Sequence, residues 1–131
     1  MTVSPGASPL SRHLPRQAPI DGYGKGGFRF EGMSHRGSLL CLPSGIYGWD
    51  APAAGVPDEP SLAKVFAEAE GIEILLVGTG PALAPLPAAL KARCRAEKIV
   101  AEPMSTGAAV RTFNVLLAEG RAVAAALVAV D

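Results

Sequence analysis

Two short turns in the second half of the chain carry the residue types best suited to hold a ligand. They are Gly78-Thr79-Gly80, which follows an apolar run, and Met104-Ser105-Thr106, which precedes an amphipathic segment. Bare backbone amides at such positions can bind an anion, and the hydroxyl groups can bind a carbonyl or anionic group. A tight structural turn and a simple helix cap are the competing interpretations, because neither a GxGxxG nor a P-loop motif is present.

The segment after the second turn offers a possible docking face. Arg111 and Asn114 lie on the side of the expected helix opposite Phe113, with the small residues Gly107 and Ala118 beside them. Arginine is enriched at the energetic centres of protein interfaces, so this face is a candidate site for a protein partner. An ordinary solvated helix face explains the same pattern equally well.

Motifs for covalent, metal or acid–base catalysis are missing from the sequence. His13 and His35 have no Cys or Ser motif nearby, and GxSxG, HExxH and CxxC do not occur. Cys41 and Cys94 fit no metal spacing, and we expect both thiols to be reduced and buried. We therefore expect no enzymatic activity, no cofactor and no metal, although a triad assembled from distant residues stays open.

The composition indicates one globular domain. The chain has 131 residues, 49% of them hydrophobic, and 12 basic residues balance 12 acidic ones. This balance argues against a nucleic-acid partner, and the lack of a long apolar run argues against a membrane span. The polar, proline-rich start predicts a flexible tail over residues 1–18, followed by a single domain over residues 19–131.

The pattern along the domain changes from strands to alternating helices and strands. Residues 28–31 alternate in polarity, and the segments 37–42 and 46–49 are also typical of strands. Further on we expect helices over 60–69, 85–97 and 105–119, and strands over 72–77, 99–101 and 122–130. This order favours an α/β fold with parallel strands. If strands 72–77 and 99–101 are neighbours, the two turns lie at the same sheet edge.

Several segments resemble one small α/β family, and together they cover about Pro19 to Val130. They are Pro19–Gly24, Gly27–Phe30, Trp49, Ile74–Gly80 and Met104–Asn114. The family includes bacterial and archaeal proteins and the mitochondrial assembly factor 3 of respiratory complex I. The resemblance implies a three-layer fold with helices on a central mixed sheet, whose last strand runs against its parallel neighbours. It also implies no established enzymatic activity or cofactor.

Two functional hypotheses remain open. In the first, the chain is a non-enzymatic protein-binding module, an assembly factor or chaperone for subunits of a membrane-associated complex. In the second, it binds a small molecule or anion, or acts as a weak enzyme, in the crevice between Gly78–Gly80 and Met104–Thr106. The expected location is the bacterial cytoplasm, with a peripheral position at the inner membrane as one option and the mitochondrial matrix as the alternative.

Overall fold

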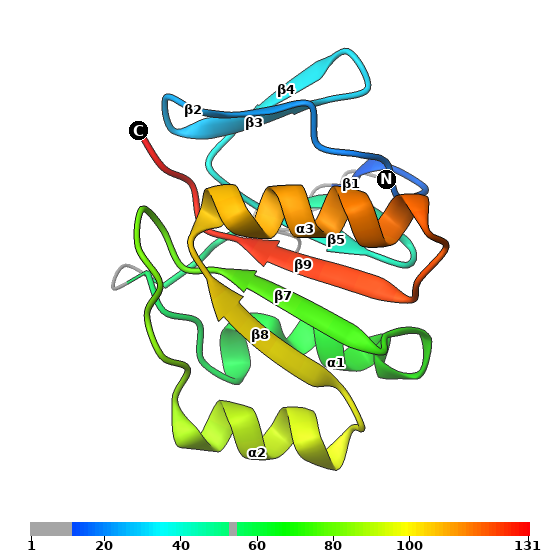
Figure 1. The fold of residues 1–131 in the computed structure, drawn as a ribbon, viewed down its shortest axis with the longest axis vertical. Coiled ribbons are helices and arrows are strands. Elements are labelled where there is room, and N and C mark those ends of the chain that lie inside the picture. The colour runs from blue at the N-terminus through cyan, green and yellow to red at the C-terminus, as the bar shows by residue number, and fades with distance from the viewer. Residues whose placement is uncertain (1–11, 53–54) are drawn as a thin grey trace, which may run out of the picture.

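The computed structural model describes residues 12–52 and 55–131, which fold into one α/β domain (Figure 1). Its strands are β1 (Arg12–Leu14), β2 (Gly22–Gly24), β3 (Gly27–Phe30), β4 (Met33–Arg36), β5 (Ser38–Leu42), β6 (Gly45–Trp49), β7 (Ile74–Gly78), β8 (Val100–Met104) and β9 (Val123–Leu127). Its helices are α1 (Ala63–Ala67), α2 (Ala88–Ala96) and α3 (Thr106–Ala118), and the 3-10 turns η2 (Pro60–Leu62) and η3 (Ala69–Gly71) flank α1.

The central sheet is mixed, as expected. Within the described residues its strand order is β1-β6-β5-β9-β7-β8, and a separate small sheet has the order β2-β3-β4. The direction expected for the last strand was wrong: β9 runs parallel to β7 and antiparallel only to β5. The reason is that α2 and α3 each return the chain to the end of the sheet where the next strand starts. The antiparallel members are contributed instead by the N-terminal strands.

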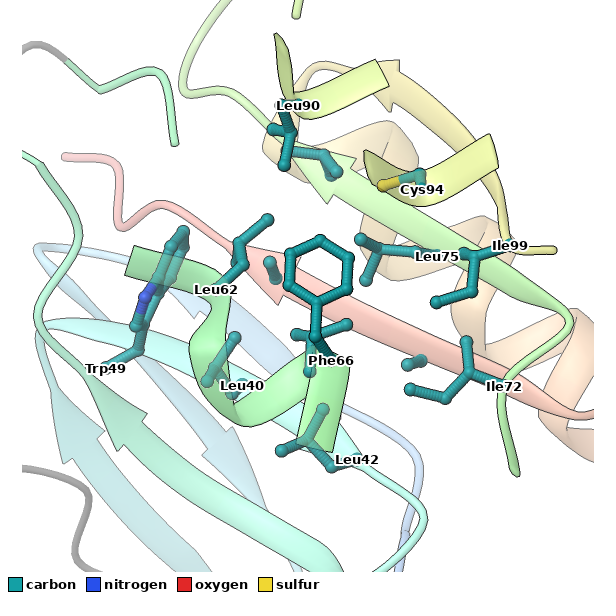
Figure 2. Packing of buried hydrophobic residues seen from close by; sticks show 14 of the residues in the cluster. Leu40, Leu42, Trp49, Leu62, Phe66, Ile72, Leu75, Leu90, Cys94 and Ile99 are labelled. Carbon is teal, nitrogen blue, oxygen red and sulfur yellow. The ribbon is translucent and has the colours of Figure 1, made fainter. Parts of the chain in front are cut away.

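Alternating side chains of the central sheet build two cores, one on each face. Helices α1 and α2 cover one face, whereas α3 and the small sheet cover the other (Figure 1), which gives the expected three layers. Figure 2 shows the first core, where Phe66 from α1 and Cys94 from α2 lie over Leu75 of β7. The second core contains Phe30 of the small sheet and Phe113 of α3.

The N-terminal boundary of the domain lies earlier than expected. Residues 1–11 of the expected tail lie outside the described residues, but Arg12–Leu14 form an edge strand paired with β6. Ala18 is buried, and the Gln17 side chain donates a 2.7 Å hydrogen bond to the carbonyl of Val123. A strand of three residues is too short to produce a recognisable pattern, so the sequence could not reveal it.

The expected helices differ from the structure mainly at their starts. Pro87 is the N-cap of α2, so this helix begins later than residue 85, because proline and the residue before it disfavour helical geometry. The expected helix over 60–69 is divided into η2, α1 and η3. Among the described residues, no helix combines the length and the apolar character that crossing a bilayer requires.

Candidate functional site

The structure places the two turns side by side, as the sequence predicted. Strands β7 and β8 are parallel neighbours, and Gly78 at the end of β7 lies opposite Met104 at the end of β8. Both turns therefore lie at the carboxyl edge of the sheet, where α/β proteins commonly bind ligands.

The turns are, however, hydrogen-bonded directly to each other. The amide of Thr79 donates to the carbonyl of Met104 at 2.9 Å, and the amide of Thr106 donates to the carbonyl of Gly80 at 2.8 Å. The amide of Gly80 donates to the Thr106 hydroxyl at 3.0 Å, and this hydroxyl donates to the carbonyl of Val128 at 2.6 Å. These amides are thus used within the protein, and the turns form a seam that joins the ends of β7, β8 and β9.

The other two hydroxyls of the turns have local partners as well. The Thr79 hydroxyl donates to the carbonyl of Ala82 at 2.8 Å and accepts the amide of Ala84 at 2.9 Å. Ser105 is the N-cap of α3, and its hydroxyl accepts the amide of Ala108 at 3.3 Å. Thr79 therefore shapes the loop after β7, and Ser105 caps the helix.

An open hollow lies next to this seam, on the same side as Arg111. It has a volume of about 450 Å³. Its lining includes Tyr23, Gly80, Ser105, Gly107, Arg111 and Asp131. We call it the Arg111 hollow. Arg111 is exposed and forms no ion pair or hydrogen bond with any other described residue.

Tyr23 covers part of the candidate docking face on α3. A Cβ atom at Gly107 would overlap the Tyr23 hydroxyl group, so only glycine lets β2 approach α3 this closely. The Tyr23 side chain remains partly exposed and lines the Arg111 hollow. The surface around Arg111 is therefore a hollow with an aromatic wall, and not an open helix face.

Asn114 does not belong to an open docking face. Its side-chain amide donates to the carbonyl of Ile20 at 2.9 Å, and its side-chain oxygen accepts the amide of Ile20 at 2.8 Å. The side chain thus holds one peptide unit of the N-terminal segment against α3. No local sequence signal could have revealed this role, because the two residues are 94 positions apart.

The two histidines, which sequence reasoning left apart, are hydrogen-bonded to each other. Nε2 of His13 lies 3.0 Å from Nδ1 of His35, and Nε2 of His35 lies 3.0 Å from the carbonyl oxygen of Ser38. Burial, followed by the charge of His35, lowers the pKa of His13. Among the described residues no third ligand joins them to make a metal-binding group.

A second polar cluster joins α1 to the turn between β5 and β6. The Glu68 carboxylate accepts the Ser44 amide at 2.9 Å and the Ser44 hydroxyl at 2.6 Å. The Tyr47 hydroxyl also contacts Ser44, and Lys64 lies 3.7 Å from Glu68. The Ser44 hydroxyl donates its hydrogen bond to the Glu68 carboxylate. The cluster is therefore arranged as a structural link between α1 and the turn.

Comparison with known proteins places these features in a family. A family model described as "Protein of unknown function (DUF498/DUF598)" matches residues 20–128. An uncharacterized protein of Rhodobacter capsulatus is 46% identical over 83% of this chain and 82% of its own length. Human NADH dehydrogenase [ubiquinone] 1 alpha subcomplex assembly factor 3 is 31% identical over 91% of this chain, which spans 65% of the human protein.

A solved structure extends the similarity to the whole fold. The crystal structure of a Bartonella henselae protein, described as an outer membrane protein, superposes with a TM-score of 0.88 at 56% identity. The superposition covers 91% of this chain and 100% of the Bartonella chain. The family match includes the seam, Arg111, Asn114 and all of the small sheet. The chain therefore belongs to the DUF498/DUF598 family.

Proposed function

We propose that this chain is a non-enzymatic assembly factor, which binds a protein subunit of a membrane-associated complex. The observation that carries the proposal is the similarity to the human protein, whose name states an assembly role and which aligns with 91% of this chain. We place the chain in the bacterial cytoplasm, where it meets its partner at the inner membrane.

The Arg111 hollow is the contact site that we propose for this partner. An exposed guanidinium without an internal partner is free to form a bidentate pair with a carboxylate of another protein. Tyr23 supplies an aromatic wall beside it, and tyrosine and arginine are both enriched at interface hot spots. The hollow thus offers a site for one acidic side chain of a partner, and the Tyr23 ring beside it offers an apolar surface for packing.

The crevice hypothesis has less support than protein binding. A ligand in the crevice would need the amides of Thr79, Gly80 and Thr106, and these amides already have partners inside the protein. Thr106 is fully buried, so its hydroxyl does not face the solvent either. Binding at this edge of the sheet therefore depends on the groups that surround Arg111.

Site-specific photo-cross-linking in the cell of origin tests the proposal. With p-benzoylphenylalanine in place of Pro81, an exposed residue in the lining of the hollow, illumination should produce an adduct with a subunit of a membrane complex, identified by mass spectrometry. In the same background Arg111→Ala should reduce the adduct about tenfold or more, since loss of an interface arginine costs roughly 2 kcal/mol of binding. The free energy of unfolding of the Arg111→Ala variant should change by no more than about 0.5 kcal/mol, as for most surface positions.

Arg95→Ala is the matched control, because Arg95 is an exposed arginine on α2 and lies outside the hollow. Its adduct should equal that of the parent chain. The proposal fails if no protein is cross-linked at position 81. The contact site is wrong if Arg111→Ala leaves the adduct unchanged or if it unfolds the protein.

A further inference from the structure

One face of the small sheet points away from the core. Phe28 and Phe30 of β3 are buried, so Arg29 between them points to the opposite face. Arg29 lies directly opposite Gly22 of β2 and Ser34 of β4. Residues opposite each other in adjacent strands share a face, so these three positions form one row across the sheet.

A second row runs beside the first. Gly27 of β3 lies opposite Gly24 of β2 and Arg36 of β4. A Cβ atom at Gly27 would overlap the carbonyl oxygen of His35, so this position cannot carry a side chain. The result is a hollow of about 600 Å³, with a floor of glycines and with arginines beside it. We call it the glycine groove, and its lining includes Gly22, Gly24, Lys25, Gly27, Arg29 and Arg36.

The charge of the glycine groove is positive, although the chain as a whole is neutral. Lys25, Arg29 and Arg36 are exposed, and none forms an ion pair among the described residues. Two nearby acids have other partners, since Glu31 lies 3.3 Å from Arg16 and Asp21 accepts the amide of Glu31 at 3.2 Å. A third acid, Asp131, approaches Gly24, where its carbonyl oxygen would lie 3.9 Å from an added Cβ. Residues 1–11 and 53–54 contain no Asp or Glu that could neutralise the groove.

The glycine groove adjoins the Arg111 hollow, because Tyr23 lines both. A partner that occupies the hollow therefore lies next to the groove at Tyr23. Asp131 lines the Arg111 hollow but not the groove, so the groove itself has only cationic side chains among its charged lining residues.

We propose that the glycine groove binds an extended acidic segment of the partner protein, an inference that rests on the proposed function. The glycine floor leaves room for an extended backbone, and two guanidinium groups can each hold a carboxylate in bidentate geometry. A planar bilayer surface would not fill a hollow of this kind. Lipid headgroups and nucleic acid are therefore the alternative occupants that the test must separate.

Fluorescence anisotropy with the full chain provides the test. The probe is a fluorescein-labelled ten-residue peptide that alternates Glu and Gly, and its control has Gln in place of Glu. We expect the Glu peptide to bind at low salt at least tenfold more tightly than the Gln peptide. The double variant Arg29→Gln/Arg36→Gln should lose at least about tenfold of this affinity.

The double variant Lys91→Gln/Arg95→Gln is the matched control, because it removes the same charge from two exposed residues outside the groove that form no ion pair among the described residues. It should bind the Glu peptide within about twofold of the parent chain, and thermal unfolding should show that both double variants are folded. Equal weakening in the two double variants would mean a non-specific charge effect and would overturn the proposal. So would equal binding of the two peptides.

Two further probes identify a wrong occupant. The first is a ten-residue oligothymidine and the second is phosphatidylglycerol vesicles. If either binds more tightly than the Glu peptide, and if this binding depends on Arg29 and Arg36, the assignment to an acidic protein segment is overturned. The cross-link from position 81 separates this inference from the proposed function. If Arg29→Gln/Arg36→Gln keeps the adduct while Arg111→Ala loses it, the groove proposal fails and the function stands. If no adduct forms although the Glu peptide binds the groove, the function fails.

Discussion

At the scale of single residues, the contact between His13 and His35 is part of a hydrogen-bond chain between three strands. The carbonyl of Ser38 can only accept a hydrogen bond, so Nε2 of His35 carries a hydrogen. In a neutral ring its Nδ1 is then an acceptor, and it receives the Nε2–H of His13. One hydrogen-bond chain thus connects β1 to β4 and β5.

Stability should therefore fall in weakly acidic solution. The pKa of His13 is lowered from its ordinary value of 6.5 in the folded state, so the unfolded chain binds this proton more tightly. The contribution of His13 is complete above pH 6.5 and is lost as the pH falls from there through the lowered pKa. Urea titrations between pH 8 and pH 5 should show that the free energy of unfolding falls with pH. The fall should be smaller for His13→Gln than for the parent chain. Equal pH slopes for the two proteins would contradict the role of His13.

Asn114 is the residue whose replacement should separate folding from docking on α3. Asn114→Ala leaves the amide and the carbonyl of Ile20 without their partners, which should cost about 2–4 kcal/mol of unfolding free energy. Arg111→Ala, one turn earlier on the same helix, should cost no more than about 0.5 kcal/mol. Urea titrations of the two variants provide the measurement. A loss below about 0.5 kcal/mol for Asn114→Ala would show that this clamp does not hold the N-terminal segment.

At the scale of elements, predictability follows burial. The strands β5 and β7 lie inside the central sheet, and their continuous apolar runs were recognisable. The strands β2 and β4 were not, because the small sheet buries mainly the two phenylalanines of β3 and leaves its neighbours partly exposed. Short strands of glycine and polar residues have no periodic pattern to detect.

The edge strand β1 should contribute to stability despite its length. A chain that lacks residues 1–14 loses the pairing with β6 and the bond from His13 to His35, whereas a chain that lacks residues 1–11 keeps both. We expect the shorter chain to be less stable than the longer one by roughly 2–3 kcal/mol. Urea unfolding of the two truncated proteins tests this difference. Identical midpoints would mean that the fold begins after β1.

At the scale of the whole molecule, the central sheet separates two cores, and the candidate site lies where distant segments meet. The sequence could locate the two turns, because parallel β7 and β8 must end at the same edge. It could not show that the turns bond to each other, nor that Tyr23 and Ile20 approach α3. These contacts join residues that are far apart in the chain, and they depend on side-chain geometry that no local pattern encodes.

The two cysteines report on the two cores separately. Cys41 lies in β5, between β6 and β9, and faces the α3 side of the sheet, whereas Cys94 lies in α2 on the other side. Both are free and buried, as expected, and burial raises the pKa of each thiol. Native labelling with a thiol reagent should therefore be slow at both positions and rapid after denaturation.

Cys94 should react before Cys41 under mildly destabilising conditions. Exposing Cys94 requires only that α2 separates from the sheet next to the edge strand β8, whereas Cys41 lies on an interior strand and is exposed only when the whole sheet opens. Labelling in increasing urea, with mass spectrometry to assign each site, should give two rates below the unfolding midpoint that merge above it. Cys94→Ala and Cys41→Ala leave one thiol each and confirm the assignment. A faster reaction at Cys41, or rapid native labelling at either site, would contradict the two-core arrangement.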